Sequence, residues 1–514
     1  MFSKVKSCAV HGVDGRMIDV EADVNDGLPV FTMVGYLSSS VRESSERVRT
    51  ALKNSGFHLP PKRITINLSP ADMRKDGSGY DLAIATAVLL SLGVTAELPM
   101  EQTLVLGELS LDGSIKAIPG VLPMVICARE EGMTSCIVPK ENVQEAALVQ
   151  GISVIGVSSL KETMEYIQGI KEYENTNVEQ PAVDTSEYLY DIDFSDVVGQ
   201  ESIKRGMEIA AAGFHNVLLT GAAGAGKSML AKRLPTILPQ MSFEESLEVT
   251  KIYSVGGMLP PEGGLIHRRP FRAPHHTISE YALIGGGRVP TPGEVSFAHY
   301  GVLFLDELPE CSKPVLEVLR QPLEDRRIRI SRVQASYEFP ADFMFVAAMN
   351  PCPCGNYPDY RRCSCTKQQT RRYQSKVSGP LLDRIDIRME VKGVKQEVLF
   401  SKQKTESSKT IRARVEQARQ MQKERFAGTG LLFNSQLDGK NLEEYITLSE
   451  EGKRLVLQLF EEQELSVRGV HRVLKLARTI ADLAGSEEIE HAHLQEAAFY
   501  RNQDVFAKEV LHGN

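Results

Sequence analysis

The spacing of apolar and polar residues changes character twice along the chain. In the first part, ITINLSPAD (64–72) has the two-residue period of a strand, and YDLAIATAVLLSL (80–92) is apolar enough for a buried helix. TLVLGELSLDGSI (103–115) alternates like a β-hairpin. From Asp193, apolar strand-like runs alternate with helical spacing, which predicts a parallel sheet.

The last part of the chain has a different pattern. SKTIRARVEQARQMQKERF (408–426) and VHRVLKLARTIADLAG (470–485) carry apolar residues at helical spacing, with few strand signals around them. Between the first two parts, residues 171–190 are polar, aperiodic and contain a proline, which is typical of a linker. We expect an α/β protein with an α+β domain over 1–170, a linker over 171–190, an α/β core over 191–395 and a helical subdomain over 396–514.

A glycine-rich segment follows the first apolar run of the core. NVLLT (216–220) leads into GAAGAGKS (221–228), which fits G-x-x-x-x-G-K-[ST] and is called the phosphate loop below. In such a loop, backbone N–H groups close around phosphate oxygens, the lysine reaches the outer phosphates and the hydroxyl can hold magnesium. A plain glycine-rich turn fits less well, because strand, loop and helix follow in the required order. The expected ATP-binding residues are Gly221, Ala222, Ala223, Gly224, Ala225, Gly226, Lys227 and Ser228.

Two further apolar runs of the core end in polar residues. GVLFLDELPE (301–310) places Asp306 and Glu307 at the end of a predicted strand, and FMFVAAMN (343–350) ends in Asn350. We expect Asp306 to hold Mg²⁺ with Ser228, and Glu307 to orient or deprotonate the attacking water. Asn350 is suited to sensing the terminal phosphate or that water. A strand ending in an acidic turn is common by itself, but the preceding phosphate loop favours the catalytic interpretation.

Composition narrows the classes of function. Over 514 residues, 42% are apolar and 25% are charged, which are ordinary globular values. The net charge of −8 argues against a uniform basic surface for nucleic acid, but it allows a local basic channel. The chain does not start with a charged and then apolar leader, and its longest apolar run, 82–94, is interrupted and short for a membrane span. We expect a cytoplasmic protein without membrane contact.

Four of the eight cysteines crowd into CPCGNYPDYRRCSC (352–365). Cys352, Cys354, Cys363 and Cys365 are numerous enough for a Zn²⁺ site, although zinc ligands are usually separated by two or more residues. Four reduced thiols in an ordered loop explain the pattern equally well.

The motifs in this order resemble those of AAA+ ATPases. DFSDVVGQESIKRGMEIAAAGFHNVLLTGAAGAGKS, RPFRAPHHT, GVLFLDELPE, NPCPCG and LLDRIDI are similar to the magnesium-chelatase-like ComM/YifB family, over essentially the whole chain. The resemblance implies a ring, usually of six subunits, in which Arg384 enters a neighbour's nucleotide site. By itself, Arg384 beside Asp383 and Asp386 also fits a surface ion pair. SVRGVHRVLKLAR (466–478) resembles the sensor-2 helix, with Arg468 at the motif position and Arg472 as a lesser candidate.

Basic residues gather in two places within this acidic chain. RRIRISRVQASYEF (326–339) predicts a β-hairpin with a turn near 332–334 and four arginines within 326–332. It resembles the pre-sensor-1 hairpin that projects into the central pore in the clade of replicative helicases and magnesium chelatase, which makes Arg329 and Arg332 candidate DNA contacts. A solvated basic hairpin is the alternative. Residues 361–376 add six basic and no acidic residues, which suits contact with a phosphate backbone.

The first domain resembles the Lon-type protease domain. RKDGSGYDLAIATAVLLSLG (74–93) is similar to its nucleophile motif, but Gly79 stands at the nucleophile position with Ser78 one residue early, and Pro123 takes the place of the catalytic lysine. A serine–lysine pair needs both partners. We expect an inactive Lon-like domain. His275 and His276 lack a third metal ligand, so we assign them to an insertion facing the pore or a ring neighbour.

The sequence is most consistent with an ATP- and Mg²⁺-dependent hexameric DNA motor, resembling helicases that promote branch migration during recombination in natural transformation. Two other functions stay open. A magnesium-chelatase motor subunit would need a porphyrin-binding partner chain, and the Lon-like domain argues against it. An ATP-dependent protease or unfoldase is opposed by Gly79 and Pro123.

Overall fold

The computed structural model describes most of the chain. The described residues are 1–172, 190–260, 264–332, 335–357, 359, 361–393, 405–462 and 466–501. Nearly all of the linker predicted over 171–190 lies outside them, as does the start of the predicted helical subdomain, 396–404. None of the helices in these ranges is long and apolar enough to cross a membrane.

The N-terminal part is a seven-stranded mixed sheet in the order β3-β4-β2-β1-β5-β8-β9. Its strands are β1 (Phe2–His11), β2 (Asp14–Asn25), β3 (Val30–Val34), β4 (Arg63–Ser69), β5 (Thr103–Val105), β8 (Ser135–Pro139) and β9 (Ser153–Val157). Its helices are α1 (Ser39–Asn54), α2 (Asp81–Ser91), α3 (Val121–Glu130), α4 (Val143–Ala146) and α5 (Leu160–Ile167). Helix α2 is buried along almost all of its length, which confirms the buried helix predicted over 80–92.

The hairpin predicted over 103–115 is shorter than expected. Residues 103–105 form β5, which pairs in parallel with β1 and β8 in the large sheet. The hairpin itself consists of β6 (Glu108–Leu109) and β7 (Ile115–Lys116). Gly107 separates the two structures at φ +156°, and a Cβ there would lie 3.0 Å from Ile115. The alternation of apolar and polar residues correctly indicated strands. Leu104 and Val105, however, are buried and belong to the main sheet, not to the hairpin.

The central part contains a five-stranded sheet in the order β11-β14-β17-β10-β18, and every strand pair in it is parallel. The strands are β10 (Val217–Thr220), β11 (Phe271–Arg272), β14 (Val302–Leu305), β17 (Met344–Met349) and β18 (Ile387–Glu390). This confirms the predicted parallel sheet. Because the strands are parallel, the residues that follow β10, β14 and β17 meet at one edge.

Helices and short hairpins surround this sheet. The helices are α6 (Glu201–Gly213), α7 (Lys227–Arg233), α8 (Phe243–Val255), α9 (Glu280–Ile284), α10 (Glu294–Phe297), α11 (Lys313–Val318), α12 (Pro322–Asp325), α13 (Lys367–Gln374) and α14 (Gly379–Leu382). Strands β12 (Gly285–Gly286) and β13 (Thr291–Pro292) form one hairpin. Strands β15 (Arg327–Ser331) and β16 (Ser336–Pro340) form another, called the basic hairpin below, which pairs Arg329 with Glu338.

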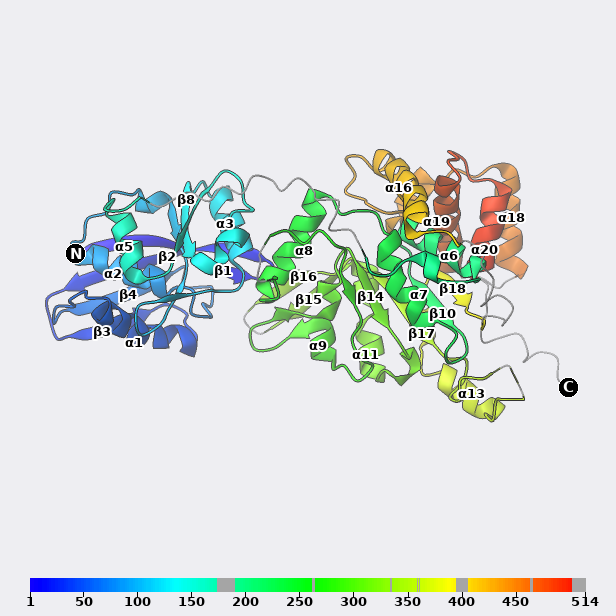
Figure 1. Ribbon diagram of the computed structural model, residues 1–514, viewed down its shortest axis with the longest axis horizontal. Helices are drawn as coiled ribbons and strands as arrows, with labels where there is room; N and C mark the ends of the chain where they lie inside the picture. Colours follow the sequence, from blue (N-terminus) through cyan, green and yellow to red (C-terminus); the bar gives the residue numbers. More distant parts are fainter. Residues whose placement is uncertain are drawn as a thin grey trace.

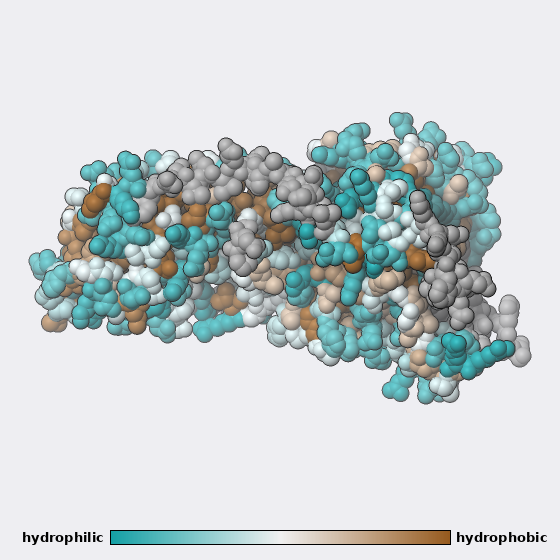
Figure 2. All heavy atoms as spheres, in the orientation of Figure 1, coloured by the Kyte–Doolittle hydropathy of each residue, from teal (hydrophilic) through white to brown (hydrophobic). Residues whose placement is uncertain are grey.

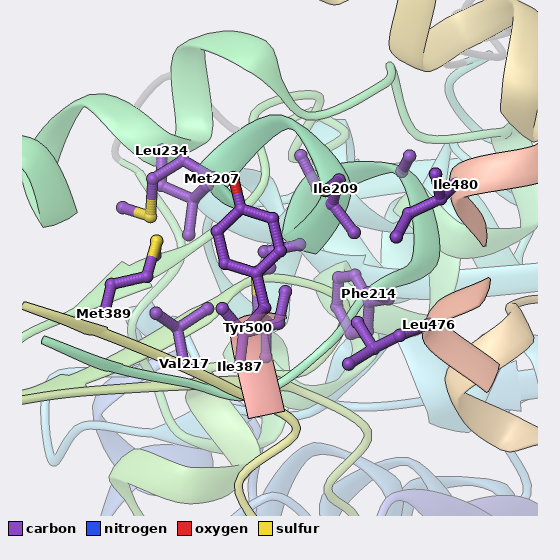
Figure 3. Packing of buried hydrophobic residues seen from close by; sticks show 14 of the residues in the cluster. Met207, Ile209, Phe214, Val217, Leu234, Ile387, Met389, Leu476, Ile480 and Tyr500 are labelled. Carbon is purple, nitrogen blue, oxygen red and sulfur yellow. The ribbon is translucent and has the colours of Figure 1, made fainter. Parts of the chain in front are cut away.

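Residues 408–501 contribute further helices. These are α16 (Ser408–Arg425), α17 (Gly439–Tyr445), α18 (Glu450–Glu462), α19 (Val467–Leu483) and α20 (His491–Arg501). Helix α20 packs on β18, α16 and α19 pack on α6, and α18 packs on α20. Figure 3 shows residues of α19 and α20 meeting residues of α6, β10 and β18 in one apolar cluster. The packing around Gly206 is close, since a Cβ there would lie 2.2 Å from Met389 Sδ and 2.9 Å from Tyr500. The helical part and the sheet therefore share a core.

The N-terminal part contacts the central part through the end of its β1–β2 hairpin. Figure 1 shows these two long strands reaching toward β15 and β16. The His11 ring stacks on Tyr337, with 4.5 Å between ring centroids, and Val13 is buried in the core cluster of the central part. Beside this contact, the Gly120 N–H donates to the carbonyl oxygen of Ser254 on α8. The basic hairpin thus lies between the parallel sheet and the N-terminal part.

Candidate ATP-binding site

The phosphate loop begins where β10 ends. Gly224 and Gly226 adopt φ +77° and φ +94°, which L-residues with a side chain rarely adopt. A Cβ on Gly221 would lie 2.2 Å from the carbonyl oxygen of Val391, so only glycine fits between β10 and the end of β18. The motif glycines are therefore required by the backbone.

Lys227 joins the loop to the end of the neighbouring strand β17. Its ammonium group donates to the carbonyl oxygens of Gly221 and Ala222 at 2.7 and 2.9 Å, and to Asn350 Oδ1 at 2.9 Å. Burial lowers the pKa of Lys227, and the nearby carboxylates of Asp306 and Glu307 oppose that shift. Lys227, predicted to reach the outer phosphates, and Asn350, predicted to sense the terminal phosphate or the attacking water, are thus brought together.

Ser228 meets the first carboxylate of strand β14. Its hydroxyl donates to Asp306 Oδ2 at 2.5 Å. The second carboxylate oxygen of Asp306 accepts the backbone N–H of Glu307 at 2.9 Å. A hydroxyl and a carboxylate side by side are the oxygen ligands that Mg²⁺ takes in phosphoryl-transfer sites. The donor set therefore fits the predicted metal.

Glu307 stands at a distorted position directly after β14. Its φ of +50° lies in the left-handed region, which is uncommon for a residue with a side chain and is concentrated at functional sites. Glu307 Oε2 lies 3.3 Å from His276 Nδ1, and the two side chains are half-exposed. The catalytic candidate is thus at the sheet edge, and its carboxylate has a partner that the sequence did not suggest.

Arg384 is folded back into its own subunit. It is buried, with its Nη2 atom on Glu324 Oε2, its Nε donating to the carbonyl oxygen of Arg320 and its Nη1 to that of Pro380. The carboxylate partner is Glu324 and not Asp383 or Asp386. A role in a neighbour's site would require the guanidinium to leave these partners.

The two arginines of α19 lie in different environments. Arg468 is exposed near the start of the helix. Arg472 pairs with the buried carboxylate of Asp386, which also accepts the backbone N–H of Asn216 at 3.0 Å. Burial alone would raise the pKa of Asp386, but Arg472 and the nearby His215 hold that pKa well below its ordinary value. Arg472 therefore connects the helical part to the sheet, and Arg468 keeps its side chain available.

Known families and proteins match this chain along nearly its whole length. Residues 20–142 match the family Subunit ChlI of Mg-chelatase, residues 193–399 match Magnesium chelatase, subunit ChlI, and residues 405–501 match its C-terminal family. The protein YifB of Escherichia coli is 41% identical over 506 residues, which are 98% of this chain and 97% of YifB. The competence protein ComM of Haemophilus influenzae is 40% identical over 503 residues, 97% of each chain. The chain belongs to the magnesium-chelatase-like ComM/YifB family.

Family membership supports the site derived from geometry. The magnesium-chelatase-like AAA+ family implies ATP and Mg²⁺, and the positions of Lys227, Ser228 and Asp306 are compatible with both. Part of the chain is also similar to a protease: Lon protease 2 of Bacillus subtilis is 30% identical over 183 residues, which are 32% of each chain. The resemblance to Lon is thus limited to about a third of this ComM/YifB-family protein.

The four clustered cysteines of this family member converge. One ligand atom from each of Cys352, Cys354, Cys363 and Cys365 lies within 4.8 Å of the others, and three of the Sγ–Sγ separations are 3.4, 3.7 and 3.6 Å. Four sulfurs at about 2.3 Å from a tetrahedral zinc would lie ~3.8 Å apart. The backbone N–H of Tyr357 also points at Cys352 Sγ, 3.4 Å away. The thiols fit a zinc site in number and spacing.

The cysteine cluster lies next to the phosphate loop. A Cβ on Gly355, between the two cysteine pairs, would lie 3.3 Å from Ala223 Cβ and 3.8 Å from Asn350 Cγ. After the cluster, α13 carries Arg371 and Arg372 in its last turn, and hydrophilic residues dominate the surface around it in Figure 2. The cysteines thus form a loop between the ATP site and a basic surface helix.

The arginines of the basic hairpin are exposed but partly neutralised. Arg327 and Arg329 both pair with Glu338 on the facing strand, at 3.0 and 3.1 Å. Arg332 Nη2 donates to the carbonyl oxygen of Gly287 at 3.2 Å. Three of the four predicted arginines belong to the hairpin, whereas Arg326 caps the end of α12 and donates to the carbonyl oxygen of Ser435. The sequence did not indicate that Glu338 would offset two of the three.

The Lon-like positions do not form a nucleophile–base pair. A Cβ on Gly79 would lie 3.1 Å from Ile118 Cδ1, so an apolar side chain fills the space beside the nucleophile position. The Ser78 hydroxyl donates to Glu108, and Pro123 lies within α3. Lys75 is fully buried, with its ammonium group on the carbonyl oxygen of Pro70. Ser78 and Lys75 are thus each engaged elsewhere.

His276 is the functional candidate that the sequence named without assigning it to the ATP site. The structural reason for its place is that Arg272 of β11 pairs in register with Leu303 of β14. His276 and Glu307 follow the ends of these two strands, and their side chains lie 3.3 Å apart. The order of the strands in the sheet was needed to see this.

Proposed function

We propose that this protein is an ATP-driven DNA motor that moves branched DNA and works as a ring of six copies. The observation that carries the proposal is that the phosphate loop and the polar residues after β14 and β17 meet at one sheet edge, in a chain that also carries a hairpin with exposed arginines. The relative from Haemophilus influenzae is named a competence protein, which supports a role in handling incoming DNA.

Hydrolysis is assigned to the ends of three parallel strands. The phosphate loop and Lys227 would bind the β- and γ-phosphates, and Ser228 and Asp306 would hold Mg²⁺, which neutralises charge on the phosphates when bound. Glu307 would accept the proton of the attacking water, and Asn350 would orient that water or the terminal phosphate. Each of these roles requires an acceptor or donor at the carboxyl edge of the sheet, where these residues lie.

Completion of the site is assigned to a neighbouring subunit. Arg384 is buried against Glu324, and leaving that carboxylate would free a guanidinium for a neighbour's γ-phosphate. Arg468 on α19 is the second candidate cation, and it is exposed. A site that needs a residue from another copy couples hydrolysis to assembly of the ring.

DNA contact is assigned to the basic hairpin and to α13. Arg329 and Arg332 would bind backbone phosphates, which requires charge and reach but no reading of bases. Their present partners, Glu338 and the carbonyl oxygen of Gly287, can be exchanged for phosphate because both pairs are exposed.

The cysteine cluster is proposed to hold one Zn²⁺ with a structural role. All four positions would be filled by thiolates from Cys352, Cys354, Cys363 and Cys365, which leaves no position for water or substrate. The ion would fix the loop that packs Gly355 against Ala223 and so keep Asn350 and the phosphate loop in place.

The Lon-like part is proposed to be inactive as a protease. The contact between the Gly79 position and Ile118 opposes the protease alternative. The chelatase alternative is opposed by similarity along nearly the whole chain to a competence protein that carries the same N-terminal part.

The proposed function is tested by ATP hydrolysis with and without single-stranded, double-stranded and branched DNA. We expect DNA to stimulate hydrolysis, with the largest effect from the branched substrate. A hydrolysis rate that no DNA changes would contradict the motor, and stimulation by a porphyrin-binding partner or an unfolded protein would favour the alternatives.

A further inference from the structure

A cavity of about 660 Å³ lies between the N-terminal part and the basic hairpin. It is called the hairpin cleft below. Its walls come from the β1–β2 hairpin, from residues 70–76, from α3 and from the β12–β13 and β15–β16 hairpins. The described residues that line it are all different from those of the ATP site. Its volume is that of a site for a small ligand, so it can take a nucleotide unit but not a double helix.

Arginines from three different hairpins line the hairpin cleft. Arg16 belongs to β2, Arg288 lies in the turn between β12 and β13, and Arg332 follows β15. All three are exposed. Within the described ranges none of them makes an ion pair with a carboxylate, and Arg332 donates to the carbonyl oxygen of Gly287. Guanidinium groups that converge on one cavity from separate elements are suited to bind an anion, phosphate above all.

Carboxylates also line the cleft, but two of the four are already paired. Their partners are Lys251 on α8 and Arg74, each at 3.0 Å. The other two, Asp72 and Glu131, make no ion pair with any residue that the structure describes. Three guanidinium groups therefore face two unpaired carboxylates. The cleft keeps an excess of positive charge in a chain whose net charge is −8.

The turn that joins β1 and β2 holds the two walls of the cleft together. The His11 ring stacks on Tyr337 with 4.5 Å between ring centroids, and Val13 is buried in the core of the central part. A Cβ on Gly12 would lie 2.8 Å from the carbonyl oxygen of Glu338 on β16. Three successive residues thus fix the N-terminal wall against the basic hairpin. Because the cleft is formed before a ligand binds, binding does not have to order it.

A second cavity, of about 420 Å³, continues from the cleft toward the former nucleophile position at Gly79. The two cavities share His11 and Tyr337 in their walls, and the second is lined by apolar groups such as Ile118 and Pro119. A charged cavity and an apolar one, joined at two aromatic rings, match the two halves of a nucleotide. Its phosphate is an anion, and its base has a flat face that stacks on aromatic side chains.

We propose that the hairpin cleft binds a short stretch of single-stranded DNA, with Arg16, Arg288 and Arg332 on its phosphates. The Lon-like part, inactive as a protease, then supplies one wall of the DNA path and the arginine on that wall. A strand held by the basic hairpin continues into a space that excludes its complement. The choice of DNA as the ligand rests on the proposed function.

The cleft is tested by the binding of a short fluorescent oligothymidylate to the purified full-length protein over a range of salt concentrations. We expect Arg16→Ala to weaken binding by about fivefold and to lower the log–log salt slope by about 0.7, the value of one phosphate contact on a single strand. Arg16→Lys should restore most of the slope, because it keeps the charge. Glu131→Gln should tighten binding, a change that misfolding cannot produce.

Arg49→Ala is the matched control, because Arg49 is an exposed arginine of the same part that lies on α1 and does not line the cleft. Its affinity and its salt slope should equal those of the wild type. An equal loss in Arg49→Ala and Arg16→Ala would reduce the effect to the general charge of the N-terminal part and would overturn the cleft.

Cys127 reports where the strand lies, because this half-buried thiol lines the cleft. Saturating oligothymidylate should slow its alkylation by a maleimide, followed by mass spectrometry of the peptide that contains it. At the same DNA concentration, protection should be weaker in Arg16→Ala. A Cys127 that DNA does not protect would overturn the cleft.

The remaining outcomes separate the cleft from the motor. Equal salt slopes for Arg16→Ala and the wild type, or a wild type that does not bind oligothymidylate, would overturn the cleft. Polyglutamate that competes as well as DNA would replace the strand by an acidic peptide and overturn it too. Binding that depends on Arg16, in a protein whose ATP hydrolysis no DNA changes, would contradict the proposed function and support the cleft.

Discussion

Lys227 of the phosphate loop donates to Asn350 across two neighbouring strands, with 2.9 Å between Nζ and Oδ1. The loop that holds Lys227 follows strand β10, and Asn350 follows strand β17, so the parallel pairing of these strands creates the contact. The ammonium group also bonds two carbonyl oxygens of its own loop. When ATP binds, its phosphate oxygens would take the place of these oxygen acceptors around the Lys227 ammonium group.

Replacing Lys227 or Glu307 should separate ATP binding from ATP hydrolysis. Lys227→Ala removes the desolvated cation, and we expect ATP affinity to fall by about 100-fold, the loss of two to three kcal/mol of charged hydrogen bonding. Glu307→Gln keeps the loop intact, so affinity should stay within about threefold while kcat falls by about 100-fold or more. Titration with a fluorescent nucleotide and phosphate release measure the two effects. Unchanged hydrolysis by Glu307→Gln would remove that residue from the mechanism.

Arg384→Ala should bind ATP and hydrolyse it poorly. Because the arginine would act in a neighbour's site, mixing this variant with wild type should reduce activity by more than its fraction in the mixture. Glu324→Gln is the matched variant: it frees Arg384 from its carboxylate while keeping the guanidinium, and it should preserve most of the activity. Activity that falls only in proportion to the mixed fraction would indicate that the Arg384–Glu324 pair has a purely local role.

The purified protein should contain about one zinc ion per chain, because four thiols within 4.8 Å leave one tetrahedral site. Cys363→Ser should lose the metal and weaken ATP binding, since the loop around Gly355 packs on Ala223. Cys127→Ser, a half-buried cysteine outside the cluster, should keep the metal. Elemental analysis and nucleotide titration give both readouts. Metal-free wild-type protein with four freely titrating cluster thiols would exclude the zinc site.

Asp386→Asn should loosen the helical part from the sheet. Removing the carboxylate leaves Arg472 without its partner at a largely buried site, which costs about 3 kcal/mol of unfolding free energy at neutral pH. The pKa of Asp386 is lowered in the folded state, so its stabilisation is present above the unfolded value of about 3.9 and is lost as the pH falls below it. Urea unfolding at pH 7 and pH 3.5 should therefore show a smaller difference between variant and wild type at the lower pH. An equal difference at both values would assign the effect to packing.

The strands of the nucleotide site could be predicted from the sequence because short buried strands are continuous apolar runs. The runs before Gly221, Asp306 and Asn350 became β10, β14 and β17, and the residues after them meet at one edge. Ser228 and Asp306 belong to motifs 78 residues apart, yet both were assigned to one metal, and the structure brings them into contact.

The partners of the charged residues could not be predicted in this way. Glu324 is 60 residues from Arg384 in the chain, and His276 reaches Glu307 only because β11 lies beside β14. Neither relationship leaves a periodic signal. The opposition of Arg329 and Glu338 depends on the register of the hairpin, which a shift of one residue would abolish.

The hairpin arginines should contribute two phosphate contacts. Arg329→Ala/Arg332→Ala should weaken DNA binding and lower the log–log salt dependence of the affinity by about one to two. Glu338→Gln should have the opposite effect on affinity, because it frees Arg327 and Arg329 from their carboxylate. Binding by fluorescence anisotropy over a range of salt concentrations measures both. Equal salt slopes for the double variant and the wild type would place the DNA contact elsewhere, with α13 as the next candidate.

The central claim is that ATP hydrolysis moves a DNA junction, and the most direct measurement follows the migration of a synthetic branched DNA during hydrolysis. We predict that the wild type moves the junction with ATP and Mg²⁺ and not with a non-hydrolysable analogue. Glu307→Gln should bind the junction without moving it, and Arg329→Ala/Arg332→Ala should move it more slowly than the wild type. A wild-type protein that hydrolyses ATP on branched DNA while the junction stays in place would contradict the account, as would migration by Glu307→Gln at the wild-type rate.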